Sequence, residues 1–383
     1  MPSQISEVLT GDLQLPAPCY TDQNIHYLET EQLYASGWMA IGFASAYAKN
    51  NHAWSIQALG KPLLITSDSN NLLHVFHNVC RHRGHVLLDA KESDVRLLSC
   101  PYHAWCYALD GRFIKAPFWG RSARTEPDPE QKSRMGLIPV KFEVWYDIIF
   151  VNLSGNAEPF DDYIEPLNKR WSEQRPASQL RCFSDREFSL QGNWKLAAEN
   201  FLDNYHLPWV HPEIGTPGSI EASLGMDVEN LLLSDNIMGF SHPTAGADKG
   251  KISVSLPPWP GMNDTEQQRQ DLFFIFPNTC LVMEGYYLWS MILFPTAVDQ
   301  CNEKLALYVV GDDAMENRLD TTRQQLSDLI YKVNSQDERV VKNLQKGRQS
   351  DAATLGIYTN LHDQLGRWFH QSVARKLLDA SQT

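Results

Sequence analysis

Positive charge is scarce in this 383-residue sequence, which holds 33 lysine and arginine residues against 46 aspartate and glutamate residues. The formal net charge of -13 argues against nucleic acid and anionic membranes as partners, because both select positively charged surfaces. Long apolar runs are also missing, since none reaches the about 18 residues that predict a membrane-spanning helix. The first residues lack the basic and apolar regions of a secretory signal peptide. We therefore expect a cytoplasmic protein with no membrane and no nucleic-acid partner.

Cysteine is sparse as well. The seven cysteines are odd in number and lie far apart, unlike the dense framework of a disulfide-bonded secreted protein, so we expect reduced thiols or metal ligands. A glycine-rich dinucleotide fingerprint is missing, so the chain is not expected to bind a nicotinamide cofactor itself. The sequence does hold 43% hydrophobic residues and 11 tryptophans, enough for a sizeable core. Its length exceeds the about 250 to 300 residues at which single cores stop growing, which predicts two domains.

Two regions of different character follow one another along the chain. Short apolar runs broken by Gly, Asn, Ser and Asp predict a β module over 36–78, continuing through 95–98 and 140–145 to 148–152. After a polar stretch, helical periodicity predominates, with strands around 270–310 and helices at 162–174, 193–207, 314–333 and 361–380. The sequence therefore predicts an α+β protein in three parts: a segment 1–35 that packs on the second domain, a β domain 36–155, and a mixed domain 156–383.

The strongest local signal is a pair of cysteine and histidine motifs. Cys80 and His82 form a C-x-H pair, and Cys100 and His103 form a C-x2-H pair. Two loops that each supply one thiolate and one imidazole suit a Rieske [2Fe-2S] cluster, in which two Cys hold one iron and two His the other. A structural zinc site is the alternative, but zinc usually draws two cysteines from one C-x2-4-C knuckle.

The residues around these ligands strengthen the interpretation. The strings CRHRG from Cys80 and CPYHAW from Cys100 resemble the CxHRG and CPYHxW signatures of Rieske oxygenases. Respiratory Rieske proteins carry an additional cysteine in each loop, and this chain has none at the matching places. Cys106 is therefore expected to be a packed thiol.

A second group of metal-binding residues follows in the mixed domain. The stretch from Asn193 to Pro212 predicts a helix that runs into a proline-bent turn, with Asp203 and His206 three residues apart on one helical face and His211 beyond them. Two histidines and one carboxylate form the facial triad of non-heme Fe(II) oxygenases. The string resembles the NWK…ENF-x-(D/E)-x-YH-x4-HP motif of Rieske oxygenase catalytic domains.

This resemblance implies a role for each residue of the group. His206 and His211 are expected to be iron ligands, and Asp203 a bridge toward the cluster. The third ligand is expected on a late helix at Asp337, with Glu338 as the substitute. Asn200 and Glu199, about one turn before Asp203, are expected to tune access and hydrogen bonding at the iron.

The resemblance also implies an architecture and an activity. It predicts an N-terminal all-β Rieske domain and a C-terminal helix-grip (START-like) catalytic domain, in which an antiparallel sheet wraps a long helix. A [2Fe-2S] cluster and a mononuclear Fe(II) are the implied cofactors. The protein is expected to be a terminal oxygenase that uses O2, with electrons from a separate NAD(P)H-dependent reductase or a ferredoxin. We expect a homotrimer in which Asp203 joins the iron of one subunit to His103, a cluster ligand, of the next.

The substrate is less constrained. Apolar and aromatic residues are frequent between 273 and 294, and an aromatic cage with a carboxylate such as Glu284 would suit a small quaternary amine such as choline or a betaine. Hydroxylation of an aromatic ring is the alternative. A different class also stays open at this point, an iron-sulfur electron-transfer protein whose second domain has lost catalysis.

Overall fold

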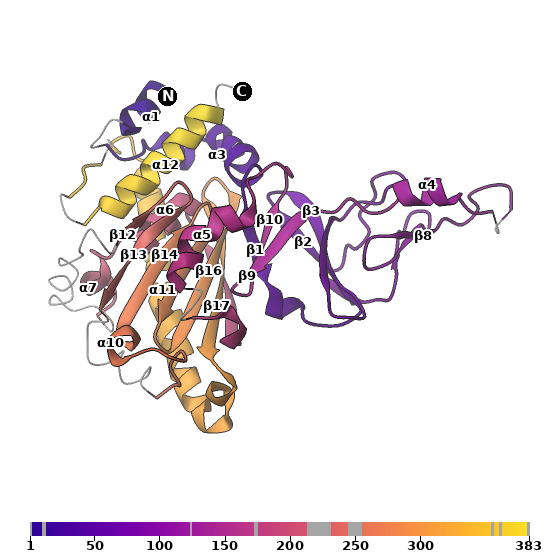
Figure 1. The fold of residues 1–383 in the computed structure, drawn as a ribbon. Coiled ribbons are helices and arrows are strands. Elements are labelled where there is room, and N and C mark those ends of the chain that lie inside the picture. The colour runs from indigo at the N-terminus through magenta and orange to yellow at the C-terminus, as the bar shows by residue number, and fades with distance from the viewer. Residues whose placement is uncertain are drawn as a thin grey trace. The chain divides into compact units, whose positions relative to one another are not determined.

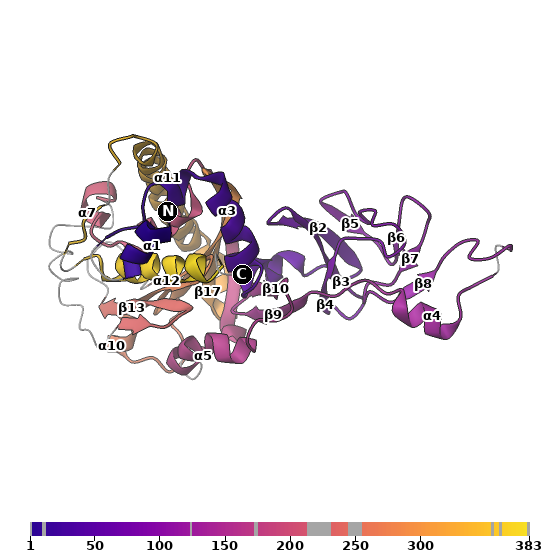
Figure 2. The ribbon, with the colours of Figure 1, turned by 90° about the horizontal axis from the view of Figure 1, so that it is seen from above.

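The computed structural model separates the chain into two compact units (Figures 1 and 2). The β unit is Ile41–Asn156, and the α+β unit combines Met1–Ala40 with Ala157–Thr383. The structure describes residues 2–9, 13–122, 125–171, 175–212, 231–243, 255–353, 356–359 and 362–380. Within these residues no helix is both long and apolar enough to cross a membrane.

The β unit consists of three small antiparallel sheets with strand orders β4-β3-β2-β5, β6-β7-β8 and β1-β10-β9. The elements of the β unit are β1 (Met39–Phe43), β2 (His52–Ala58), β3 (Lys61–Ser67), β4 (Leu73–His77), β5 (Glu92–Asp94), β6 (Leu98–Ser99), β7 (Cys106–Tyr107), β8 (Phe113–Lys115), α4 (Pro129–Arg134), β9 (Lys141–Trp145) and β10 (Ile148–Asn152). The predicted strand at 95–98 is wrong, because β5 ends at Asp94 and β6 begins only at Leu98.

A seven-stranded antiparallel sheet with the order β11-β17-β16-β15-β14-β13-β12 forms the centre of the α+β unit, as predicted. Side chains alternate between its two faces, so one face can pack against helices while the other faces away. The strands are β11 (Leu180–Leu190), β12 (Leu231–Leu233), β13 (Ile237–Pro243), β14 (Arg269–Ile275), β15 (Thr279–Glu284), β16 (Tyr287–Ala297) and β17 (Gln300–Val310).

Helices surround this sheet (Figure 1). The long helix α11 contacts β11 and α6, and α6 in turn contacts β14 and β16. The helices are α1 (Pro2–Leu9), α2 (Pro18–Thr21), α3 (Gln23–Glu29), α5 (Phe160–Trp171), α6 (Trp194–Leu202), α7 (Leu207–Val210), α10 (Asp264–Gln267), α11 (Asp320–Arg348) and α12 (Gln364–Ala380). The predicted helix 314–333 therefore starts too early and ends too soon.

The N-terminal segment packs on helices of the α+β unit. Helix α1 contacts α12, and α2 contacts α11, so the first and last parts of the chain lie side by side (Figure 2). A buried ion pair fastens this segment, since Lys195 Nζ on α6 lies 2.6 Å from Glu29 Oε1 on α3 and neither side chain is exposed. The indole of Trp194 donates to the second oxygen of Glu29 at 2.9 Å.

We expect Lys195→Met to lower the free energy of unfolding by about 3 to 5 kcal/mol, because it leaves the carboxylate of Glu29 buried without its counter-ion. The matched control is Lys169→Met, which removes an ion pair with Glu165 whose side chains are 70% and 53% exposed. That change should cost less than about 1 kcal/mol. Urea denaturation of the three proteins measures the difference, and equal losses in both variants would contradict the role of the buried pair.

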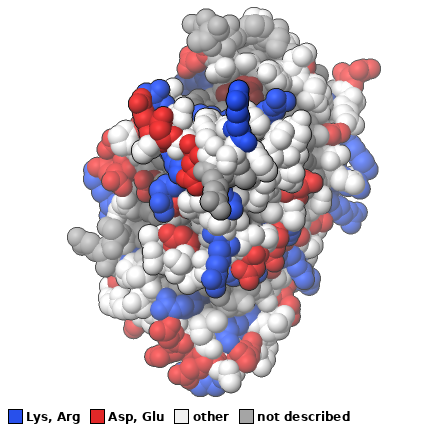
Figure 3. Space-filling model, turned by 90° about the vertical axis from the view of Figure 1, so that its right-hand side faces the viewer, with Lys and Arg blue, Asp and Glu red and all other residues white. Residues whose placement is uncertain are grey.

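The surface carries charge of both signs. Figure 3 shows one face on which Lys and Arg side chains are interspersed with Asp and Glu.

Candidate metal centres and substrate cavity

Two loops of the β unit present the four predicted cluster ligands. In the first loop, the N–H of Cys80 donates to the carbonyl of His85 at 2.8 Å, and the carbonyl of Cys80 accepts from the N–H of Gly84 at 3.0 Å. The second loop repeats both hydrogen bonds around Cys100 at the same sequence offsets, with distances of 2.8 and 2.9 Å. Gly84 and its counterpart Ala104 both have positive φ, 71° and 55°. The matching backbones place the two cysteines in equivalent positions.

The donor side chains divide into a buried pair and an exposed pair. The thiols of Cys80 and Cys100 are each 2% exposed, whereas the imidazoles of His82 and His103 are exposed, with ring centroids 4.7 Å apart. Burial raises the pKa of the Cys100 thiol, which disfavours the thiolate in the protein alone, and a bound metal would favour it. Two inward thiolates and two outward imidazoles are the donor set of a Rieske [2Fe-2S] cluster, and the residues present fit that group.

Aromatic side chains fix the two loops. The indole of Trp105 stacks on His82, with ring centroids 4.6 Å apart and an interplanar angle of 5°. The hydroxyl of Tyr107 lies 3.2 Å from Cys80 Sγ and accepts from the N–H of Arg81 at 3.1 Å. Hydrogen bonds to a ligand sulfur and packing on a ligand ring are the contacts by which a protein orients a cluster and tunes its potential.

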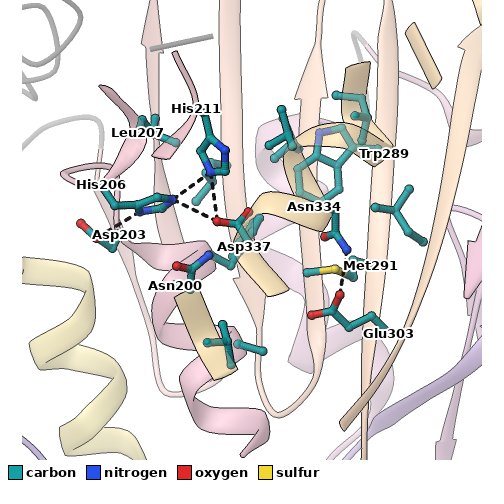
Figure 4. Close-up of a pocket in the computed structure, with 18 of the residues that line it drawn as sticks. Asn200, Asp203, His206, Leu207, His211, Trp289, Met291, Glu303, Asn334 and Asp337 are labelled. Carbon is teal, nitrogen blue, oxygen red and sulfur yellow. Dashed lines mark hydrogen bonds and ion pairs between the residues drawn. The ribbon is translucent and has the colours of Figure 1, made fainter. Parts of the chain in front are cut away.

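A second group of donors lies in the α+β unit, where His206, His211 and Asp337 meet (Figure 4). Their ligand atoms all lie within 4.8 Å of one another. The two Nε2 atoms of the histidines are 3.2 Å apart, and Asp337 Oδ1 lies 3.5 Å from that of His206 and 3.0 Å from that of His211. The histidines flank the short helix α7, with His206 before its first residue and His211 after its last, and the carboxylate comes from the middle of α11.

In both imidazoles, a side-chain oxygen atom contacts Nδ1, the ring nitrogen that does not face the other donors. Asp203 Oδ2 lies 3.1 Å from Nδ1 of His206, and Gln336 Oε1 lies 2.8 Å from Nδ1 of His211. Because both oxygens can only accept, each ring carries its proton on Nδ1 and turns the lone pair of Nε2 inward. Two lone pairs and the carboxylate of Asp337 then face one another, an arrangement that a cation stabilises. The residues present therefore fit a mononuclear iron.

The electrostatics of the protein alone also favour positive charge here. Burial lowers the pKa of His206, but hydrogen bonds to Asp203 and Asp337 outweigh it and raise the pKa to about 9. Burial disfavours the charged form of Asp337, yet its hydrogen bonds with His206 and His211 hold its pKa below the usual value. The lowered pKa of Asp337 favours its ionised form, and the pKa of His206 favours a second proton on that ring in the protein alone. A bound Fe(II) would take the place of that proton, and Nε2 of His206 would then present its lone pair.

Of the other predicted site residues, Asn200 lies beside the metal donors, whereas Glu199 and Glu338 do not join them. Asn200 lines the same cavity and hydrogen-bonds to Asp337. Glu199 points elsewhere: it accepts from the hydroxyl of Tyr20 at 2.6 Å and lies 3.1 Å from Nε2 of His370, so the structure does not bring it to the iron ligands. Glu338 is also outside the group of converging donors.

The prediction that Asp203 and His206 share a helical face is wrong. Helix α6 ends at Leu202, and Asp203 has an extended backbone, with φ −98° and ψ 117°. Its Oδ1 accepts from the N–H of Tyr205 at 2.7 Å, an Asx turn that replaces the next helical hydrogen bond. The contact between Asp203 and His206 therefore comes from a turn.

A cavity of about 110 Å³ opens beside the metal donors. Of the aromatic residues proposed for it between 273 and 294, only Trp289 is among the residues that line it. Glu284 hydrogen-bonds to Gln270 at 2.8 Å and is not part of the lining; the carboxylate that is part of it on the sheet is Glu303, which sequence reasoning missed. The other lining residues on the strands are Leu190, Gln270, Leu272, Val282, Met291 and Leu305.

Comparison with known proteins agrees with this arrangement. Residues 177–379, more than half of the chain, match the family described as ring hydroxylating alpha subunit (catalytic domain), and residues 37–126 match the Rieske [2Fe-2S] domain. The chain therefore belongs to the family of ring-hydroxylating oxygenase alpha subunits. A Rieske cluster and a mononuclear iron are the cofactors that these two domains imply.

Two of the similar proteins are oxygenase subunits of monooxygenases, one for glycine betaine and one for carnitine. The glycine betaine monooxygenase oxygenase subunit of Pseudomonas aeruginosa (strain UCBPP-PA14) is 30% identical over 381 residues, covering 91% of this chain and 85% of that protein. The carnitine monooxygenase oxygenase subunit of Escherichia coli (strain K12) is 31% identical over 199 residues; the match spans 52% of this chain and about half, 52%, of that relative.

The fold is shared with solved structures. A quaternary ammonium Rieske monooxygenase, whose structure gave insights into carnitine oxidation by gut microbiota and inter-subunit electron transfer, superposes with a TM-score of 0.75. The alignment covers 100% of this chain and 98% of that chain at 20% sequence identity.

Proposed function

We propose that this chain is the terminal oxygenase of a system with a separate electron donor and that it oxidises a small quaternary ammonium compound. One atom of O2 enters a C–H bond of the substrate, and the other leaves as water with two electrons and two protons. The observation that carries the proposal is the presence, in one chain, of four cluster donors and the converging group of His206, His211 and Asp337. The similarity to glycine betaine and carnitine monooxygenase subunits supports the substrate class.

The residues around the cavity have different roles in the proposed reaction. His206, His211 and Asp337 would hold the iron, which supplies O2 activation when bound. Asn200 donates to the carboxylate of Asp337 and so fixes its orientation beside the cavity. The largely apolar walls of the cavity exclude water from the reacting carbon.

Electrons enter at the other metal site. His82 and His103 reach the surface of the β unit, so the cluster that they would hold is accessible to a donor protein. We propose that this donor is a separate NAD(P)H-dependent reductase, directly or through a ferredoxin, and that the system works in the cytoplasm.

We further propose a ring of three identical subunits, in which each cluster serves the iron of its neighbour. The carboxylate of Asp203 is 35% exposed and uses Oδ2 for His206 and Oδ1 for the N–H of Tyr205. Each carboxylate oxygen can accept a second hydrogen bond, so Asp203 has capacity for His103 of the partner subunit. A head-to-tail interface that closes on itself generates such a ring.

A metal count and a substrate panel test the proposed function together. We expect three irons per chain and NADH-dependent O2 uptake, with matched product formation, for choline, glycine betaine or carnitine. Two irons and no turnover would indicate an electron carrier without catalysis. Turnover confined to neutral or anionic arenes would contradict oxidation of quaternary amines and indicate ring hydroxylation of an aromatic compound.

A further inference from the structure

A buried carboxylate stands in the wall of the cavity, away from the metal donors. Glu303 on β17 is 5% exposed and lines the cavity (Figure 4). Among the described residues, its side chain has one hydrogen bond, accepted by Oε2 from Asn334 Nδ2 on α11 at 2.8 Å. No lysine or arginine in the described part of the chain forms an ion pair with Glu303, so these residues give the carboxylate no counter-ion.

Burial and nearby negative charges disfavour the ionised form of Glu303. Burial raises the pKa of Glu303 to about 7; the hydrogen bond from Asn334 works against this rise, and the charges of Asp337 and Glu338 add to it. Removing a carboxylate from water without a partner carries a penalty that a cation beside it would offset. A permanently charged ligand can supply this cation, because it cannot lose its charge on entering the cavity.

Other side chains of the same cavity suit an ammonium group. The cavity also presents the rings of Trp289 and Phe201, whose centroids are 5.8 Å apart at an interplanar angle of 82°. On the paired strands, Met291 stands opposite Leu305, and both line the same cavity. Aromatic faces attract cations through their quadrupole, and alkylated ammonium groups also bury methyl groups against such walls. Glu303 pairs with Leu293 and Trp289 pairs with Leu307, so the rings lie further along the sheet than Met291 and Leu305 do. A cavity that holds this carboxylate, apolar side chains and two rings matches a quaternary ammonium compound.

The long helix sets the distance between this carboxylate and the metal donors. Asn334, which holds Glu303, and Asp337 are three residues apart on α11, and a helix rises about 4.5 Å over three residues. Figure 4 shows the Asn334–Glu303 pair on one side of the drawn residues and the histidines on the other. An ammonium head beside Glu303 would thus lie on the Asn334 side of the cavity, and Asp337 stands about one turn further along α11.

We propose that Glu303 binds the ammonium head of the substrate and thereby selects a cation over a neutral molecule of the same shape. This inference rests on the proposed function, since it assigns the charge recognition of the same site. Glu303 acts in it as a specificity-determining residue that touches the substrate, and Asn334 acts as a positioning residue.

A charged ligand and its neutral isostere test the assignment. Choline and 3,3-dimethylbutan-1-ol have the same shape, with a carbon in place of the nitrogen. We would measure the dissociation constants of both by calorimetry, without O2, on the wild-type holoenzyme and on Glu303→Gln. The amide oxygen of the glutamine can still accept from Asn334, so the variant removes the charge and keeps the hydrogen bond. The expected result is a loss of choline affinity on the order of thirtyfold, with the affinity of the neutral alcohol unchanged.

The matched control is Glu284→Gln, which makes the same substitution at a buried carboxylate on β15 that does not line the cavity. It should leave the preference for choline intact. If Glu303→Gln does not fold, Glu303→Met, an apolar side chain of similar length, takes its place with the same expectation.

The outcomes separate this inference from the proposed function. An equal loss of affinity for choline and the alcohol would show that Glu303 only maintains the shape of the cavity, and unchanged affinities would show that it contributes nothing; either overturns the assignment alone. A wild-type holoenzyme that neither binds nor oxidises any quaternary amine overturns the proposed function as well.

Discussion

Replacing His206 by alanine is expected to abolish turnover while the cluster remains intact. His206 supplies one of only three converging donors in the α+β unit's described residues, whereas the cluster donors belong to the β unit. We therefore expect the iron content to fall from three to two atoms per chain, product formation to fall below detection, and the visible and reduced EPR spectra of the Rieske cluster to persist. Metal analysis and spectroscopy of the purified variant check this directly.

The complementary variant is Cys100→Ala. It removes one of the two buried thiols, so we expect loss of the cluster spectrum. The backbone hydrogen bond between Cys100 and Trp105 does not involve the thiol, so any loss of loop structure would come from the missing cluster. Loss of the cluster spectrum in His206→Ala would contradict the division of labour between the two sites.

Asp203→Asn is expected to separate metal binding from electron transfer. The single amide oxygen can still accept from Nδ1 of His206, so this histidine keeps its hydrogen bond, whereas the acceptor for the N–H of Tyr205 and the negative charge of the proposed bridge are lost. We expect both metals and the oligomer to persist, while oxidation of a prereduced cluster by O2 and substrate slows by about 10- to 100-fold, the range for residues that support a metal ligand. Stopped-flow absorbance in a single turnover measures this rate.

Glu338→Gln is the matched control for Asp203→Asn, since it removes a carboxylate next to Asp337 that does not join the converging donors. Its rate should equal that of the wild type. Loss of iron from this variant would show that Glu338 is the third ligand. A normal single-turnover rate in Asp203→Asn, or full activity of a dilute monomeric wild type, would refute the bridge.

The metal donors were predictable because most of them lie within short stretches of sequence. Cys80 and His82 share one loop, so their spacing alone restricts the chemistry that they can perform. Asp337 is different: it stands 126 residues from His211, and periodicity cannot show that α11 crosses that place. Only the resemblance to a family connected it to the histidines.

Polar residues in buried positions account for the misplaced long helix. Helix α11 continues to Arg348, yet Asn334 and Gln345 are among the residues that face inward. Apolar periodicity therefore fades after residue 333, although the helix does not end. Similarly, the residues after α6 have no strong helix breaker before Pro208, so the end at Leu202 follows from the Asx turn of Asp203, a side-chain contact that propensity does not register.

The carboxylate of the cavity shows a further limit of sequence. Glu284 and Glu303 both lie in apolar strands, and alternation alone treats them alike. Val282 lines the cavity, and Glu284 follows two residues later on the same face of β15, beyond the lining. Which position along a strand meets the cavity depends on the register of seven strands, so it requires the folded structure. The alternation of Cys301, Glu303 and Leu305 was the available signal, because it places a carboxylate among inward-facing apolar positions.

The two sides of the cavity are built from different secondary-structure elements. This separation determines which substitutions can change the substrate range without changing the metal donors. The proposed iron donors belong to the two ends of α7 and to α11, whereas Trp289, Met291 and Glu303 belong to the sheet. Substitutions on β16 and β17 can reshape the cavity or recharge it without touching a metal ligand. A library restricted to these strand positions should therefore yield altered substrate ranges with iron content preserved, and natural lineages could diversify by the same route.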